Sequence, residues 1–171
     1  MTGSAAVDSR LQAAWAALAG VPDPEVPVLS VCDLGIVREV VSDEAGTRVV
    51  LTPTYSGCPA TEVIADSVRS ALEHAGLGPV TVSQRLAPAW TTDWISAEGL
   101  RRLHDYGIAP PGAACAGEPT VHTIRLRLRA LACPRCGSLQ TERLSAFGST
   151  ACKALHRCLD CREPFEHFKP I

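Results

Sequence analysis

The 171-residue chain lacks a long hydrophobic run, and none of its apolar stretches approaches the roughly 18 residues that a membrane-spanning helix requires. Its first residues, MTGSAAVDSR, contain neither the basic nor the apolar segment of a secretory signal. We therefore expect a cytoplasmic protein with no membrane attachment. Because cytosolic thiols stay reduced, the eight cysteines favour metal binding or redox chemistry over a disulfide framework.

Two catalytic signatures are also missing from the sequence. It contains no Glu-x-x-His pair that could hold a di-iron centre on a helix, and no Gly-x-Gly-x-x-Gly loop that could bind a dinucleotide. These absences argue against a protein that activates oxygen or transfers hydride by itself.

The composition is that of a globular protein, with 46% hydrophobic and 20% charged residues. The net charge of −2 hides an asymmetry along the chain. Residues 1–120 carry seven basic and fourteen acidic side chains, whereas residues 121–171 carry nine basic and four acidic ones. This division indicates two units with different partners.

Hydrophobic periodicity predicts the order helix–strand–strand–helix–strand–helix in the first part of the chain. The expected helices cover about residues 9–19, 59–74 and 96–106, and the expected strands cover residues 36–42, 47–54 and 80–86. In the second helix, Val63 and Ile64 are both expected on the buried face. This order is typical of an α+β domain, for which we expect the bounds 8–110.

A turn-rich segment, Pro110-Pro111-Gly112-Ala113-Ala114, predicts a linker over residues 111–120. Beyond it, residues 121–131 alternate between apolar and basic side chains, which predicts a half-buried strand. The exposed face of that strand would carry Arg125, Arg127 and Arg129. Residues 121–171 are therefore expected to form a small β-rich module.

Two CxxC pairs lie in this module, Cys133-Pro-Arg-Cys136 and Cys158-Leu-Asp-Cys161, separated by 21 residues. Each pair can offer two thiolates from one tight turn, and together they complete a tetrahedron around a metal ion. A module this short buries little hydrophobic core, so we expect a bound metal ion to stabilise its fold. The sequence predicts a four-cysteine zinc ribbon holding one structural Zn²⁺. The spacing alone leaves iron in a rubredoxin-like site open, while reduced cytosol disfavours two disulfides or a redox pair.

Cys152, in the stretch FGSTACKALHRC, is a fifth cysteine near these pairs. We favour a small residue of the ribbon core over an extra metal ligand, because four cysteines already complete the site.

Cys58 lies between a predicted strand and a predicted helix, in the stretch TYSGCPA. Pro59 suits the first helical position. There the unpaired N–H groups and the positive end of the helix dipole would favour the thiolate of Cys58. The residue types alone leave open whether Cys58 is a reactive thiol or a buried apolar residue.

Three carboxylates, Asp23, Glu25 and Asp33, share the irregular proline-rich segment that follows the first helix. Carboxylates in such segments usually cap turns, and we favour that role over metal binding or acid–base catalysis.

Four stretches, DPEVPVLSVCDLGIV, TPTYSGCPA, AWTTDWIS and GIAPP, resemble the iron–sulfur assembly domain of SufT-like proteins. The resemblance implies an α+β fold and a reactive cysteine in a Thr-x-x-x-Cys-Pro motif, here Thr54 and Cys58-Pro59. The family's Asp-Pro-Glu falls on Asp23-Pro24-Glu25. The later stretch ACPRCGS…FGSTACKALHRCLDCREPFEHFKP resembles the PaaD (also called PaaJ) family associated with the phenylacetyl-CoA epoxidase. Together the two resemblances cover about residues 8–171.

The resemblance implies an accessory, non-catalytic subunit in aerobic phenylacetate catabolism. Such a subunit would mature or deliver an iron or iron–sulfur centre for the oxygenase or the reductase of the epoxidase, with a transient iron–sulfur cluster at Cys58 as a further implied cofactor. A structural or docking subunit without metal transfer is the alternative. Whether the chain forms a homodimer stays open.

Two other functions fit the sequence less well. A thiol enzyme would need a histidine base beside Cys58, and His74 is expected about 20 Å away along the following helix. A nucleic-acid-binding ribbon could use the three arginines of residues 121–131, but the acidic first part of the chain would repel a polyanion. An acidic protein partner suits these arginines better.

Overall fold

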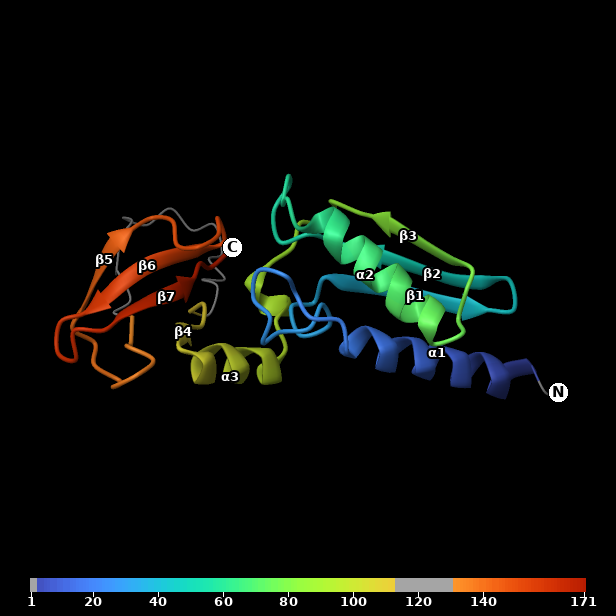
Figure 1. Cartoon of the computed structure of the whole chain (residues 1–171), viewed down its shortest axis with the longest axis horizontal. Helices are drawn as coiled ribbons and strands as arrows, with labels where there is room; N and C mark the ends of the chain where they lie inside the picture. Colours follow the sequence, from blue (N-terminus) through green and yellow to red (C-terminus); the bar gives the residue numbers. More distant parts are fainter. Residues whose placement is uncertain (1–2, 113–130) are drawn as a thin grey trace, which may run out of the picture. The chain divides into compact units, whose positions relative to one another are not determined.

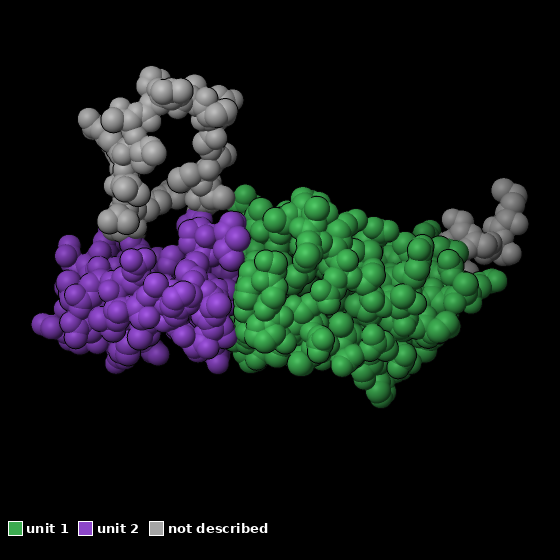
Figure 2. Space-filling model, turned by 90° about the horizontal axis from the view of Figure 1, so that it is seen from above, with its two compact units in different colours: residues 1–99 green, residues 100–171 purple. Residues whose placement is uncertain are grey.

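The computed structural model describes residues 3–112 and 131–171 (Figure 1). The chain divides into two compact units, Met1–Gly99 and Leu100–Ile171, which Figure 2 shows in separate colours. The α+β class expected from the sequence is confirmed. The expected bounds 8–110 and the linker 111–120 stay predictions, because most of that linker lies outside the described residues. The observed division falls earlier, after Gly99.

The first unit has a three-stranded sheet of order β1-β2-β3. Its elements are α1 (Gly3–Ala19), β1 (Val37–Asp43), β2 (Gly46–Leu51), α2 (Thr61–His74), β3 (Val80–Gln84) and η1 (Thr92–Trp94). β1 and β2 form an antiparallel hairpin, and β3 joins β2 in parallel. A parallel pair needs a crossover, which α2 supplies. In Figure 1, α1 and α2 run along this sheet, and α1 contacts β1 while α2 contacts β3.

Helix α2 differs from the sequence expectation at two points. It begins at Thr61, so Pro59 precedes the N-cap residue Ala60 and does not occupy the first helical position. Its buried stripe is Ile64, Val68 and Leu72, whereas Val63 is 54% exposed. One residue turns a helix by about 100°, so Val63 and Ile64 cannot both face the same core.

No described helix combines the length and the apolar character that a bilayer crossing demands. The longest, α1, buries Ala14 and Leu18 but exposes Trp15.

The second unit carries a four-stranded sheet of order β4-β7-β6-β5. Its strands are β4 (Ile108–Ala109), β5 (Thr141–Ser145), β6 (Lys153–Cys158) and β7 (Pro164–Phe168). They follow α3 (Ala97–Tyr106), which begins shortly before the division between the units. The two-residue β4 pairs in parallel with β7 and is too short for a sequence pattern to reveal. The expected strand over residues 121–131, with its three arginines, lies almost wholly outside the described residues.

Two contacts hold the stretch around η1 in the first unit. The indole N–H of the buried Trp90 donates a hydrogen bond of 2.8 Å to the carbonyl oxygen of Leu34. The next residue, Gly35, has φ 66° and lies under Trp94, where a Cβ would be 2.5 Å from the Trp94 carbonyl oxygen. Glycine is thus required at Gly35 both by conformation and by space.

Replacing Gly35 with alanine should lower the free energy of unfolding by about 3 kcal/mol or more, because positive φ and the clash with Trp94 add together. Gly76→Ala is the matched control: Gly76 has φ 73° but no atom within 4 Å of a Cβ, so it should lose only about 1 kcal/mol. Urea unfolding followed by tryptophan fluorescence measures both losses. Equal losses would show that the close approach to Trp94 carries no cost.

Candidate metal centre and reactive cysteine

The four cysteines of the two CxxC pairs converge in the second unit. The sulfurs of Cys133, Cys136, Cys158 and Cys161 all lie within 4.8 Å of one another. Between the pairs, Cys133 Sγ is 3.8 Å from Cys161 Sγ, and Cys136 Sγ is 3.5 Å from Cys158 Sγ. A tetrahedral ion with bonds of about 2.3 Å sets neighbouring sulfurs about 3.8 Å apart. The geometry therefore fits one metal ion bound by four thiolates.

The two CxxC turns share one backbone pattern. In the first turn, the N–H of Gly137 donates to the carbonyl of Cys133 at 2.8 Å, and Gly137 has φ 75°. The residue after the second pair, Arg162, also has a positive φ, 66°. The residue directly after each CxxC pair therefore has a left-handed backbone conformation. Only the first pair is followed by a glycine, the residue that would indicate this conformation from the sequence.

A hydrogen bond that does not involve the metal ligands also joins the two CxxC turns. The hydroxyl of Ser138, just after the first pair, donates to the carboxylate of Asp160, which lies within the second pair. The sequence does not predict this bond, because nothing in the spacing indicates that these two residues meet. Bonds of this kind keep metal ligands in place before and after the ion binds.

The metal ligands and the hydrophobic core of the ribbon are partly the same residues. Cys133 and Cys158 are 1% and 0% exposed and form a buried cluster with Ala109 and Phe165, against which Leu131 packs. Cys136 and Cys161 are exposed and close the site from the solvent side. A small core built around two ligands depends on the ion for its stability.

Bare thiols at this spacing influence one another strongly. The backbone N–H groups of Cys161 and then Asp160, together with neighbouring sulfurs, lower the pKa of Cys158 to about 7 against an opposing effect of burial. At Cys161, the backbone N–H of Glu163 lowers the pKa, but burial and the three other sulfurs outweigh it and raise the pKa to about 12. A cation among the four sulfurs favours the thiolate form of all of them.

Cys152 lies outside this group of four. It is buried just before β6, with its sulfur 3.0 Å from the hydroxyl oxygen of Thr150. The structure places it as the expected small buried residue and does not bring it into the metal group. Its role as a ligand is therefore not supported by the geometry.

His156 and His167 pack on the same sheet. The ring of His156 stacks on Phe165 with centroids 5.7 Å apart and meets His167 edge-on at 5.5 Å. Burial, with a smaller effect of His156, lowers the pKa of His167 to about 4. Burial and the nearby Arg143 lower the pKa of His156. Both rings are therefore neutral packing groups at pH 7.

Cys58 lies in the turn that leads from β2 into α2. It is half-buried, its N–H donates to the carbonyl of Tyr55 at 3.3 Å, and its carbonyl accepts from the N–H of Thr61 at 3.2 Å and the hydroxyl of Thr61 at 2.8 Å. Gly57 before it has φ 89° and open space around its missing side chain. Thr54 of the same motif is buried, at 8% exposure. The turn thus holds Cys58 by its backbone.

No group of three or more candidate ligands includes Cys58 in the described part of the chain, where the ribbon cysteines form the one such group. Cys58 can therefore contribute a single sulfur ligand. Cys32 lies in the same unit, and burial and the charge of Asp33 raise its pKa to about 11.

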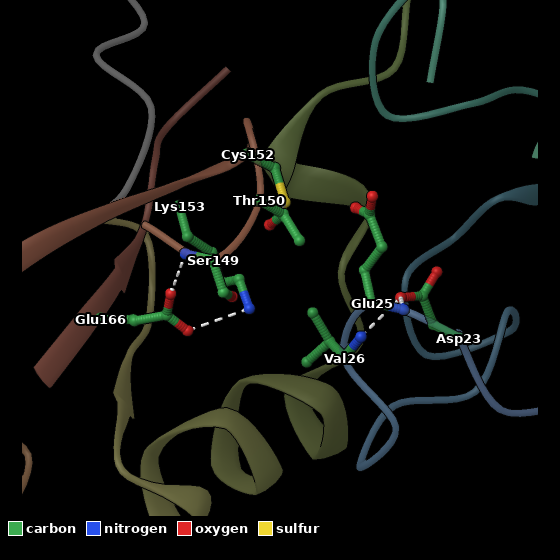
Figure 3. Close-up of polar contacts among 8 residues, drawn as sticks. All are labelled: Asp23, Glu25, Val26, Ser149, Thr150, Cys152, Lys153 and Glu166. Carbon is green, nitrogen blue, oxygen red and sulfur yellow. Dashed lines mark hydrogen bonds and ion pairs between the residues drawn. The ribbon is translucent and has the colours of Figure 1, made fainter. Parts of the chain in front are cut away.

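The carboxylates of the proline-rich segment hold its turns. Asp23 is buried, and its Oδ1 accepts hydrogen bonds from the N–H groups of Glu25 and Val26 at 2.9 and 2.8 Å (Figure 3). Asp33 accepts from the N–H and hydroxyl of Ser30 at 3.0 and 2.9 Å, and from the Ser96 hydroxyl at 3.1 Å. These are turn-capping contacts of the kind expected from the sequence. A functional role for Asp23, Glu25 and Asp33 beside Cys58 stays a prediction.

Comparison with protein families divides the chain in the same way. Residues 11–83 match the family described as iron-sulfur cluster assembly protein, and residues 117–169 match the PaaD zinc beta ribbon domain. The solved structure of a domain of unknown function, DUF59, from Bacillus anthracis covers 58% of this chain and 96% of that chain, with TM-score 0.55 and 24% identity, and shares the fold. The chain thus joins a domain of the iron–sulfur cluster assembly family to a zinc ribbon of the PaaD type.

Curated relatives identify the family of the whole chain. A putative 1,2-phenylacetyl-CoA epoxidase subunit from Escherichia coli K12 is 49% identical over 92% of this chain and 91% of its own length. An Fe-S protein maturation auxiliary factor from Porphyromonas gingivalis is 35% identical over 47% of this chain and 78% of its own, and the factor YitW from Bacillus subtilis is 38% identical over 47% and 79%. The chain belongs to the PaaD family of phenylacetyl-CoA epoxidase subunits.

Cys136→Ser should remove the bound metal and unfold the ribbon, since the ligands are also its core, while the first unit stays folded. Cys152→Ser, which changes a buried cysteine outside the group of four, is the matched control and should keep one metal ion per chain. Elemental analysis and hydrogen exchange of the full chain measure both effects. A Cys136→Ser variant that keeps its metal and its amide protection would contradict the assignment.

Cys58 should be the first cysteine outside the ribbon to react in a limited alkylation at neutral pH. Cys32 is held as the thiol by its raised pKa, so it should react much more slowly. Peptide mapping of the metal-loaded protein identifies the labelled residue. Preferential labelling of Cys32, or of Cys115 outside the described residues, would count against Cys58 as the reactive thiol.

Proposed function

We propose that the chain is a non-catalytic accessory subunit that matures or delivers an iron or iron–sulfur centre to the oxygenase or the reductase of a phenylacetyl-CoA epoxidase. The observation that carries the proposal is the union, in one chain, of an iron–sulfur cluster assembly domain and a PaaD-type ribbon. The relative from Escherichia coli is named as an epoxidase subunit, and the two shorter relatives are named as Fe-S protein maturation factors.

We assign zinc as the resident metal of the ribbon, held by Cys133, Cys136, Cys158 and Cys161. The fit rests on the four sulfurs within 4.8 Å and on the closed all-thiolate donor set. Zinc in such a site supplies folding energy and leaves no ligand position open for a substrate. The ribbon would then be the rigid part of the subunit, and the metal cargo belongs to the first unit.

Cys58 would hold the cargo through one sulfur. A [2Fe–2S] or [4Fe–4S] cluster takes four cysteine ligands, and in the described residues no group of three or more candidate ligands includes Cys58. The remaining ligands would come from the receiving subunit or from a second copy of this chain. A site completed only by a partner is suited to transfer, because the cluster leaves when the partner leaves. This is where a homodimer would enter the mechanism.

A thiol enzyme is disfavoured by the position of His74. Its ring nitrogen lies 2.7 Å from the carbonyl oxygen of Ser70 at the far end of α2, whereas Cys58 precedes the start of that helix. A general base must lie within hydrogen-bond reach of its nucleophile.

Cys58→Ala should lower the iron and sulfide content of the oxygenase or the reductase several-fold and slow growth on phenylacetate, as deletion of the whole chain should. A methyl group cannot bind iron, so the loss follows from the missing sulfur. Cys32→Ala, a half-buried cysteine of the same unit, is the matched control and should leave both partners loaded. Both variants are compared with the deletion strain at equal amounts of the catalytic subunits.

If both partners are fully loaded without this chain while epoxidase activity is still lost, the maturation role is wrong. The docking role without metal transfer would then be the better account. The ribbon favours that second candidate, because its closed metal site is suited to shape a binding surface.

A further inference from the structure

A partly buried ion pair between β6 and β7 holds the loop that joins β5 to β6. Glu166 of β7 lies 2.9 Å from the ammonium of Lys153, and these side chains are 22% and 4% exposed. The same carboxylate accepts the backbone N–H of Ser149 at 2.5 Å, as Figure 3 shows. A further bond of 2.8 Å runs from the N–H of Gly148 to the carbonyl of Lys153. One carboxylate therefore ties the loop to two strands.

Gly148 makes this arrangement possible. A Cβ at that position would lie 2.5 Å from Glu166 Oε1, so any other residue would push the carboxylate away from the loop. Burying a charged pair costs desolvation energy, and such pairs are weak evidence for stability. We therefore interpret the pair Lys153–Glu166 as an interaction that holds residues 146–152 in one conformation.

The fixed loop presents an aromatic ring to solvent. Phe147 is 64% exposed, and the ammonium of Lys169 lies 4.6 Å from the centre of its ring. Lys169 also donates to the carbonyl of Ala146 at 3.2 Å, and the N–H of Phe147 donates to the Ser145 hydroxyl at 3.1 Å. The nearby Leu144, at the bulge of β5, is exposed as well. A cation thus covers one face of the ring, and most of the ring stays open to solvent.

A single exposed apolar residue is ordinary, so the case for Phe147 rests on the hydrogen bonds and the ion pair that order its loop. Ordering a loop costs conformational entropy on binding, and a loop that is already ordered binds without that loss. Aromatic residues in such positions are frequent energetic anchors of protein interfaces. Phe147 therefore has the features of a preorganised anchor.

The charges around the anchor select the kind of partner. The carboxylates of Glu142 and Glu166 are engaged by Arg157 and Lys153. In the described residues, Lys169 has no carboxylate partner, so its positive charge remains uncompensated against the ring of Phe147. An exposed ring with the Lys169 ammonium at its edge complements an apolar pocket bordered by carboxylates.

We propose that residues 144–149 and Lys169 form a docking surface on which Phe147 enters an apolar, acid-rimmed pocket of a protein partner, the epoxidase component that this chain serves. The inference rests on the proposed function for the choice of partner, and it deepens that function by separating binding from metal transfer. Cys58 would carry the cargo, and the ribbon would recognise the recipient.

The test measures binding of the purified, metal-loaded chain to the purified oxygenase and reductase components by biolayer interferometry. Phe147→Ala should raise the Kd for one component at least about tenfold. Lys169→Glu should slow association, most strongly at low salt. Leu86→Ala removes an equally exposed apolar side chain (61%) from the first unit, so this control should bind as the wild type does.

Glu166→Gln adds a test of the preorganised loop. It should weaken binding less than Phe147→Ala and speed hydrogen exchange of Ser149, with zinc content unchanged. Normal binding by Phe147→Ala, no binding of either component by the wild type, or a change only in self-association of the chain would each overturn the docking surface. These outcomes are read on the chain loaded with zinc alone, with no iron–sulfur cluster at Cys58, so a failure of the docking surface can be told apart from a failure of cargo transfer.

Discussion

The second unit depends on the meeting of four sulfurs within 4.8 Å. Ionised thiolates at that spacing repel one another, and two of them belong to a buried hydrophobic cluster of the ribbon. A metal ion bound by the four thiolates neutralises this repulsion and holds the hydrophobic core of the ribbon together. The antiparallel pairing of β5 with β6 agrees with this closure of the core, because it sets the two CxxC turns at the same end of both strands, with Thr141 paired to Cys158. Even β4, which contributes Ala109 to the cluster, depends on this closure.

The first unit is held by apolar packing and capped turns. Asp23 and Asp33 satisfy backbone N–H groups of a segment that prolines exclude from regular structure. That segment and the stretch around Trp90 are bound together by the indole hydrogen bond to Leu34. In the same unit, Cys58 is partly exposed and lies, among the described residues, outside any group of three or more candidate ligands.

The two units therefore suit different parts of one task. In the proposed carrier, Cys58 would hold a metal centre together with ligands from another molecule. A closed four-cysteine ribbon exchanges nothing, but it can keep a surface loop in one conformation. The buried pair Lys153–Glu166 and the exposed Phe147 extend that rigidity to the surface. The opposite net charges of the two parts of the chain agree with this separation of roles.

Sequence patterns alone determined the α+β class, the order of the elements in the first unit and the four cysteines that converge, because periodicity and CxxC spacing are local properties of the chain. They could not place Val63 on the exposed side of α2 or move the start of that helix to Thr61, because packing against the sheet decides both. Only the tertiary structure brought Ile108–Ala109 into the ribbon and Ser138 to Asp160. The pairing of Lys153 with Glu166 was likewise decided by the tertiary structure. These residues are far apart in the chain and meet only because the strands that carry them, β6 and β7, lie side by side.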